Sequence, residues 1–215
     1  MLINGDAGNL TEDQKHFVER IYEGTDRMIA LVNLLLQIAR VEAGRVKIEP
    51  MPVDLKTTTQ GVLVTLKAMV EKKHQKIEIT TDPQPFPTIL LDQEVIWQVI
   101  QNLLSNALRY SDEASTILVS IVKKDEFVEY SVKDTGIGIP EHEKPRIFNR
   151  FFRAENALKK VPEGSGLGLS LVKLLVNNWG GKIWFESEEG KGTTFHVTIP
   201  LEGMKPKEGE VKLAV

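Results

Sequence analysis

The sequence contains no cysteine, no long apolar run and no marked excess of charge of either sign. Without cysteine, disulfide bonds, thiol nucleophiles and cysteine-ligated metal sites are excluded. No apolar run reaches the roughly 18 residues that a membrane-spanning helix needs, and Met1 is not followed by a basic and then apolar signal segment. The formal net charge of −3 gives no reason to expect nucleic acid or an anionic membrane as a partner.

The remaining composition is that of an ordinary globular protein. With 215 residues, of which 41% are hydrophobic and 27% are charged, the chain is long enough for one or two domains with cores of their own.

One helix is predicted clearly between Asp92, a good N-cap residue, and Ser111. Its apolar residues recur at helical spacing and form a broad face for burial: Val95, Ile96, Val99, Ile100, Leu103, Leu104, Ala107 and Leu108. A second face carries polar and aromatic residues: Asn102, Asn106, Arg109 and Tyr110. These side chains can hold a hydrated Mg²⁺, its phosphates and a stacked base. An amphipathic helix with a polar solvent face explains this stretch equally well.

Two glycine-rich turns follow this helix. Asp134-Thr-Gly136-Ile-Gly138-Ile-Pro140 comes directly after a strand-like run at 127–133, and Gly164-Ser-Gly166-Leu-Gly168 opens an apolar helix. Glycine permits positive φ and a close approach to the backbone, and free N–H groups at a helix start attract phosphate. Glycine-rich turns also occur in many folds without binding a ligand, so neither turn is decisive alone.

Five motifs in this order resemble those of two-component sensor histidine kinases, over roughly residues 55–200. They are an N box in the helix at 98–111, a G1 box at 134–140, an F box at 146–153, a G2 box at 164–168 and a last glycine motif at 190–195. A single glycine motif is weak evidence, but five in the family's order are specific.

The resemblance implies a site for ATP and Mg²⁺. The implied catalytic residues are Asn102, Asn106, Arg109 and Arg153, and the implied metal ligand is Asn106. The implied nucleotide-binding residues are Asn106, Arg109, Tyr110, Asp134, Gly136, Ile137, Gly138, Ile139, Gly164, Ser165, Gly166, Leu167, Gly168 and Thr194. Asp134 would accept a hydrogen bond from the adenine amino group, and Arg153 would reach the γ-phosphate. Arg109 stands where the family more often has lysine, so its geometry toward phosphate can differ.

Asn102 separates a kinase from an ATPase. In related ATPases of the superfamily a glutamate at this position activates water, whereas an asparagine amide has no useful basicity near neutral pH. We therefore expect ATP to be held without rapid hydrolysis, so that its γ-phosphoryl group remains available for an incoming nucleophile.

The fold class predicted for the chain is α+β: a two-layer α/β sandwich with one mixed sheet and helices on one face, preceded by a long helix. By resemblance, residues 1–44 contain the second helix of a dimerisation and histidine-phosphotransfer hairpin; packing of that helix on its own domain is the alternative. Residues 45–53 are predicted as a linker and 54–201 as the catalytic ATP-binding domain. Residues 202–215 are predicted to be disordered. A mobile lid is expected at 141–163, anchored by three phenylalanines: Phe148, Phe151 and Phe152.

None of the four histidines lies in the family's H box, so we expect the phosphoacceptor to be absent from this chain. His16 has the wrong neighbours, His74 falls at the end of a predicted helix, His196 falls within the last predicted strand, and His142 falls in the expected lid. The resemblance implies a response regulator receiver domain and a second protomer as partners. It also implies a cytoplasmic location, with or without a membrane-bound parent. The alternatives are an ATP-binding module without kinase activity and a protein-serine kinase of the same superfamily.

Overall fold

The chain divides into two compact units, residues 1–39 and 40–215, and the computed structural model describes residue 8 and residues 10–213. Residues 1–7 and 9 of the region 1–44, and the last two residues of the expected tail, lie outside the described residues. In the described part, no helix is long and apolar enough to cross a membrane.

Helix α1 (Glu12–Glu42) is a single helix of 31 residues. Its start is a reciprocal capping box: the Thr11 backbone N–H donates to Gln14 Oε1 (2.9 Å), and the Gln14 backbone N–H donates to Thr11 Oγ1 (3.3 Å). Many large apolar side chains along the helix are exposed: Phe17, Ile21, Tyr22, Met28, Ile29, Val32, Leu35 and Leu36. An exposed apolar stripe of this length is typical of a helix that packs against a partner.

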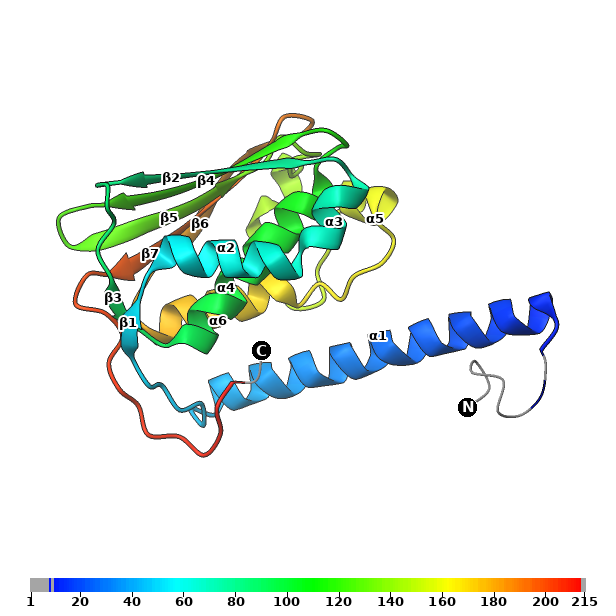
Figure 1. The fold of residues 1–215 in the computed structure, drawn as a ribbon, viewed down its shortest axis with the longest axis horizontal. Helices are drawn as coiled ribbons and strands as arrows, with labels where there is room; N and C mark the ends of the chain where they lie inside the picture. The colour runs from blue at the N-terminus through cyan, green and yellow to red at the C-terminus, as the bar shows by residue number, and fades with distance from the viewer. Residues whose placement is uncertain (1–7, 9, 214–215) are drawn as a thin grey trace. The chain divides into compact units, whose positions relative to one another are not determined.

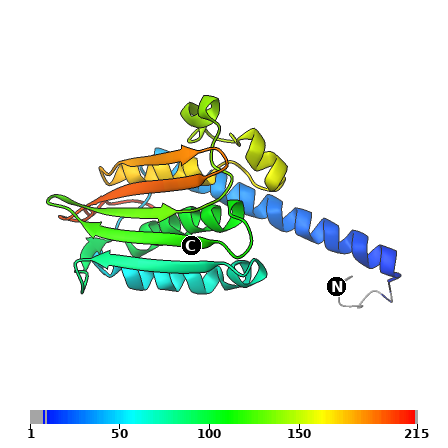
Figure 2. The same ribbon diagram turned by 90° about the horizontal axis from the view of Figure 1, so that it is seen from above.

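A two-layer α/β sandwich forms most of the second unit, as predicted. Its five-stranded sheet has the order β2-β4-β5-β7-β6, with bounds β2 (Lys76–Asp82), β4 (Thr116–Lys123), β5 (Phe127–Lys133), β6 (Ile183–Glu188) and β7 (Gly192–Pro200). The sheet is mixed, because β2 pairs parallel with β4 while every other pairing is antiparallel. Helices α2 (Leu55–Thr65), α4 (Gln93–Tyr110) and α6 (Gly168–Asn178) lie on one face of the sheet (Figures 1 and 2).

Local sequence signals explain how these elements form. Asp92 caps α4 as predicted: its Oδ1 accepts hydrogen bonds from the backbone N–H groups of Glu94 and Val95, both at 3.1 Å. The predicted apolar face of α4 is buried. In the sheet, alternate residues of β5 point into the core, and the hydroxyl of Tyr130 meets Thr59 Oγ1 of α2 at 3.1 Å in a buried contact. This pair satisfies two polar groups that would otherwise be unpaired between the layers.

Two elements differ from the prediction. The sequence after Asp54, a capping residue, predicts one helix to about Lys73, but the structure divides it at Leu66 into α2 and a short α3 (Lys67–Lys72). The sequence also predicts a short strand at Thr88–Leu91, and the strand that forms there, β3 (Ile89–Leu91), does not join the main sheet. It pairs antiparallel with β1 (Met51–Val53), which lies in the expected linker. Alternation of apolar residues indicates a strand but not its partner, so this separate two-stranded sheet has no local signal.

The C-terminal strap, residues 202–213, is ordered against the expected linker, in contrast with the prediction of a disordered tail. Lys207 and Ile48 exchange two backbone hydrogen bonds (3.0 and 3.1 Å), and the Lys47 N–H donates to the Val211 carbonyl (3.0 Å). Met204 and Leu213 are buried. These apolar residues are nine positions apart among polar ones, so they show no periodicity that would predict packing.

The close packing of the strap makes Gly209 a test of its contribution to stability. A Cβ at this position would lie 2.4 Å from the Lys47 backbone nitrogen and 2.5 Å from the Val46 carbonyl carbon. We expect Gly209→Ala to lower the free energy of unfolding by about 1–3 kcal/mol, because the backbones must move apart. Urea denaturation measures the loss. The neighbouring exposed Glu208→Ala serves as the control, and equal stability of the two variants would contradict the packing of the strap.

Candidate functional site

The polar residues predicted on α4 all lie along its last three turns, and each is half-buried. The Asn102 amide is hydrogen-bonded at its nitrogen and closely packed at its oxygen. Its Nδ2 donates to the Gln98 carbonyl at 2.8 Å, and its Oδ1 lies 2.6 Å from where a Cβ on Gly168 would be. Asn102 therefore lies directly under the start of α6, and Asn106 follows one turn later on the same face of α4.

Asp134 is a buried carboxyl group at the end of β5, with 6% of its surface exposed. Its Oδ1 accepts hydrogen bonds from the backbone N–H groups of Gly136 (2.8 Å) and Thr193 (3.2 Å). Burial raises the pKa of Asp134 to about 6, although the two amide hydrogen bonds act in the opposite direction. Its other oxygen, Oδ2, has no hydrogen-bond partner among residues 10–213. The first glycine turn and β7 thus hold the Asp134 carboxylate through one oxygen and leave the other oxygen free.

The first glycine turn packs against the protein's own backbone. A Cβ on Gly136 would lie 2.5 Å from the Tyr110 carbonyl oxygen, and Gly138, with φ +62°, would place one 2.0 Å from the Glu188 carbonyl oxygen. Ile139 is buried, and its N–H donates to Ser187 Oγ at 2.9 Å. The end of α4, the turn after β5 and the end of β6 therefore meet at this point.

The second glycine turn brings both predicted arginines together. A Cβ on Gly164 would lie 3.4 Å from a terminal nitrogen of Arg109 and 3.4 Å from the guanidinium carbon of Arg153. Helix α6 begins four residues later, at Gly168, and no side chain caps its N-terminus. The first N–H groups of a helix have no partner within the helix, so those of α6 are left without a side-chain cap.

Two other residues of this turn contribute chiefly to its shape. Leu167 is fully buried, so its side chain belongs to the core and only its backbone faces the turn. Ser165 Oγ accepts a hydrogen bond from the Leu167 N–H at 3.3 Å. Neither side chain needs a ligand to explain its position.

The lid expected at 141–163 is built from two short helices, the 3₁₀ helix η1 (Glu141–Arg146) and α5 (Glu155–Lys160). Buried Glu143 joins them by accepting the Glu155 N–H. The lid is tied to the first glycine turn by Asn156, whose Nδ2 donates to the carbonyls of Gly138 (3.0 Å) and Ile137 (3.4 Å).

Arg153 is engaged within the lid. Its guanidinium donates to the carbonyl oxygens of Pro162 (2.6 Å), Gly164 (3.3 Å) and Val161. A contact between Arg153 and a γ-phosphate would therefore have to replace some of these bonds.

The three phenylalanines of the F box do not all anchor the lid. Phe148 packs edge-on against Phe185 with ring centroids 5.7 Å apart, and the guanidinium of Arg146 lies 4.4 Å above the Phe152 ring. Phe151 is 59% exposed, which contradicts the prediction that it packs. Gly166 packs closely against the backbone of Phe151 and Phe152, where φ of Phe151 is +61°, and the Phe151 side chain points outward.

Thr193, rather than the predicted Thr194, lies beside Asp134. Along β7 the buried residues alternate, and Thr193 shares the inner face with Phe195 while half-buried Thr194 shares the outer face with His196. Thr193 Oγ1 also contacts Ser187 Oγ at 2.8 Å. Side chains alternate between the two faces of a strand, so the sequence shows that only one of Thr193 and Thr194 can face inward. It does not show which of the two does, because the inner face of β7 is set by packing.

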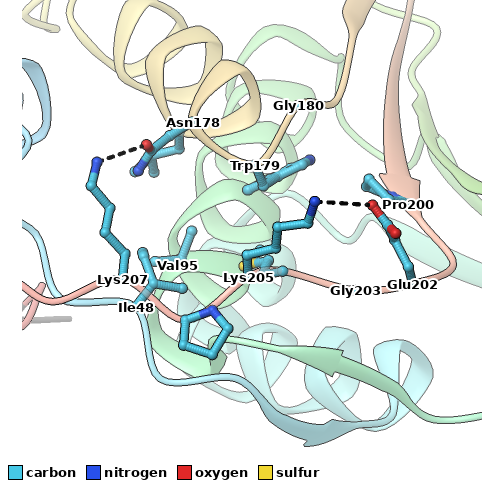
Figure 3. Close-up of a pocket in the computed structure, with 13 residues that line it drawn as sticks. Ile48, Val95, Asn178, Trp179, Gly180, Pro200, Glu202, Gly203, Lys205 and Lys207 are labelled. Carbon is cyan, nitrogen blue, oxygen red and sulfur yellow. Dashed lines mark hydrogen bonds and ion pairs between the residues drawn. The ribbon is translucent and has the colours of Figure 1, made fainter.

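A separate hollow of about 480 Å³ lies between the end of α6, the end of β7 and the C-terminal strap. Figure 3 shows its two rim lysines, Lys205 and Lys207, directed toward Glu202 and Asn178 respectively. Because none of its lining residues is a predicted site residue, this hollow is distinct from the arrangement around Asp134.

Comparison with known proteins gives a family. Residues 91–203, more than half of the chain, match the model of the family described as histidine kinase-, DNA gyrase B-, and HSP90-like ATPase. Among curated relatives, the circadian input-output histidine kinase CikA of Synechococcus elongatus is 31% identical over 93% of this chain and 27% of its own length. The sensor histidine kinase WalK of Bacillus subtilis is 35% identical over 83% of this chain and 29% of its own length. The chain thus spans less than a third of the length of these two relatives.

Solved structures agree with this assignment. Full-length ShkA in complex with AMPPNP superposes with a TM-score of 0.78 at 28% identity, covering 94% of this chain and 42% of that one. The catalytic domain of histidine kinase ThkA superposes with a TM-score of 0.62 at 30% identity, covering 71% of this chain and 96% of that one. These matches confirm the resemblance indicated by the five motifs. The chain belongs to the family of histidine kinase-, DNA gyrase B- and HSP90-like ATPases, and the relatives that it matches are histidine kinases.

Proposed function

We propose that this chain binds Mg·ATP between α4, the two glycine turns and the start of α6, and transfers the γ-phosphoryl group to a histidine for relay to an aspartate of a response regulator. Family membership and the kinase relatives support this assignment. The structure with AMPPNP, an ATP analogue, supports the nucleotide for that relative and makes ATP the first ligand to test here.

The observation that carries the proposal is the free oxygen of Asp134. Asp134 Oδ2 is not one of the buried atoms left without a partner, so it is open to solvent, and a donor on a ligand can reach this acceptor at the otherwise buried carboxyl group. The adenine amino group is a donor that fits this acceptor, whereas guanine has no donor at the same position. The half-buried ring of Tyr110 follows Arg109 at the end of α4 and would line the base side of the site.

The phosphates would lie near Gly164, where the guanidinium groups of Arg109 and Arg153 converge beside the uncapped start of α6. Asn106 would give one side-chain oxygen to Mg²⁺, which keeps water and phosphate as its other ligands. This fits the described residues, which hold no cluster of three or more acidic or histidine side chains able to bind a metal alone. When bound, Mg²⁺ neutralises charge on the transferring group.

Asn102 favours transfer to a protein nucleophile over hydrolysis. Its amide nitrogen donates to the Gln98 carbonyl, its amide oxygen lies close to Gly168 at the start of α6, and the amide cannot take a proton from water. The chain's contribution to the reaction is then to position ATP and to stabilise charge, which is the usual basis of phosphoryl transfer.

The phosphoacceptor and the partners are supported less directly. The described histidines lie on α1, in the turn after α3, in η1 and on β7, and none is in an H-box sequence. We propose that the acceptor histidine is supplied from outside the motifs of this chain. The exposed apolar stripe of α1 supports pairing with further helices, including those of a second protomer, and the relatives' role in signalling supports a response regulator receiver domain as the final acceptor.

A transfer assay tests the proposal. The chain is mixed with Mg·ATP labelled on the γ-phosphate and a homologous full-length kinase whose own nucleotide site is disabled. We expect acid-labile, base-stable label on that partner. If ATP binds but no label appears, the chain is either an ATP-binding module or a kinase that needs the first hairpin helix on its own chain in order to dock, and adding that helix separates the two. Acid-stable label would indicate a serine kinase instead.

Asn106→Ala should abolish Mg²⁺-dependent transfer in this assay without unfolding the chain, because it removes the one protein ligand proposed for the ion. Gln101→Ala removes an amide of similar burial from the same helix and should retain transfer. Circular dichroism checks that both variants fold. Transfer by Asn106→Ala at the rate of Gln101→Ala would exclude the metal role of Asn106.

Asp134→Asn should weaken Mg·ATP binding by about 1–3 kcal/mol, because a charged hydrogen bond in a buried position is lost. Titration calorimetry measures the Kd. Asp125→Asn changes an exposed aspartate in the turn between β4 and β5 by the same chemistry, and it should leave the Kd unchanged. Equal affinities of the two variants would remove Asp134 from the site.

Asp134 should also make stability fall as pH rises. Its pKa is raised by burial from 3.8 to about 6, so between these values the folded chain keeps a proton that the unfolded chain releases. The stabilisation is complete below about pH 4 and is lost as pH rises through about 6, a change of roughly 3 kcal/mol. Urea unfolding of the wild type and Asp134→Asn across this range should give a difference that varies by this amount. A constant difference would show that Asp134 titrates normally.

A further inference from the structure

The last turn of α4, which carries Arg109 and Tyr110, is held in place by two side chains from the turn between α3 and β2. Lys73 lies at the end of α3, and its Nζ donates to three carbonyl oxygens of this turn, those of Leu108 (3.0 Å), Arg109 (2.7 Å) and Ser111 (2.9 Å). An ammonium group has three protons, so all of its donors are used on one helix end.

Gln75 adds a second set of bonds to the same region. Its buried Nε2 lies within hydrogen-bond distance of the carbonyl oxygens of Leu108 (3.2 Å) and Asp112 (3.0 Å) and of Ser115 Oγ (3.2 Å). Two of these three neighbours can only accept, so the amide orientation is fixed with the nitrogen toward them. Between the two side chains, His74 has φ +51°, which makes the turn tight and lets residues on both sides of it reach α4.

The charge of Lys73 suits its position. The final carbonyl groups of a helix have no intrahelical partners and carry the negative end of the helix dipole, so a cation there is stabilising. Burial, and next the charge of Lys160, lower the pKa of Lys73. Asp112 and Glu113 act in the opposite direction, and Arg109 acts with Lys160. Three carbonyl contacts around one nitrogen match the ammonium form.

The turn held by Lys73 touches both glycine turns. The Tyr110 carbonyl oxygen packs against Gly136, and the guanidinium of Arg109 lies beside Gly164. A shift of this turn by a fraction of an ångström would therefore move the cation proposed for phosphate relative to the N-terminus of α6. Misplacement of this kind is costly for phosphoryl transfer, which depends on position.

We propose that Lys73 is a positioning residue for the nucleotide site: by binding the last carbonyls of α4, it sets the place of Arg109 against the second glycine turn. This inference rests on the proposed function. The effect of Lys73 on the nucleotide passes through Arg109, and Lys73 itself touches only backbone carbonyls.

The test measures the Kd of Mg·ATP by titration calorimetry at low temperature, well below the unfolding midpoint of each variant. Lys73→Met keeps most of the side-chain volume and removes the donors, so we expect the Kd to rise roughly tenfold or more. The exposed neighbour Lys72→Met is the matched control and should bind like the wild type. Lys73→Arg keeps the charge, but its planar donors cannot surround one point as an ammonium does, so an intermediate Kd is expected.

A double-mutant cycle separates positioning from a general structural role. In an Arg109→Met background, Lys73→Met should change the Kd little, because the group that it positions is gone. If Lys73→Met does not fold, Lys73→Arg is used for the same cycle. An equal Kd for Lys73→Met and Lys72→Met, or an effect of the Lys73 variant that is the same in both backgrounds, would overturn the inference.

The two proposals fail differently. If the wild-type chain binds no Mg·ATP, both the proposed function and the positioning role of Lys73 are rejected. If the wild type binds Mg·ATP and the Lys73 variants bind equally well, only the positioning role is overturned.

Discussion

The burial of the Asp134 carboxyl group is the constraint on which the site depends. Its Oδ1 binds amides from the turn that follows β5 and from β7, so one oxygen fixes the relation of three segments. Burial opposes ionisation of this group and raises its pKa. Its presence with a free second oxygen is explained if the energetic cost is offset when a donor-bearing ligand binds.

The parts of the fold that could be predicted are those whose signals are local. The start and the buried face of α4 follow from Asp92 and from apolar spacing, and the structure confirms both. The same Asp92 also accepts the Glu49 N–H through Oδ2 at 2.8 Å, a contact 43 residues away in the chain that no local pattern indicates. The pairing of β1 with β3 and the packing of the C-terminal strap likewise depend on contacts between residues far apart in the chain. Their stability comes from long-range partners, which a single sequence does not specify.

Within the site, too, local sequence signals predict some features while long-range packing decides others. The motifs grouped the right segments, but they did not decide which face each residue occupies. Thr193 and Thr194 are adjacent and chemically identical, and only the register of β7 against β5 directs one of them to Asp134. Lys73 gave no signal at all, because a lysine at a helix end is ordinary in sequence. Its role depends on the carbonyls of a helix 35 or more residues away.

The glycines of the two turns carry a further consequence for how the site is tested. At Gly136, Gly138 and Gly166 an added Cβ would meet the protein's own backbone at 2.8 Å or less, and at Gly168 it would meet Asn102. Loss of activity on substituting any of these four would follow from disrupted packing, whether or not nucleotide touches them. At Gly164 an added Cβ would meet only guanidinium groups at 3.4 Å or more, although φ there is +140°. That φ is far more restrictive for an L residue than the +76° and +78° of Gly180 and Gly190, so neither open glycine matches its strain. Loss of activity in Gly164→Ala would therefore include the cost of a strained backbone, and the side chains of Arg109 and Arg153 are the better sites at which to test the phosphate region.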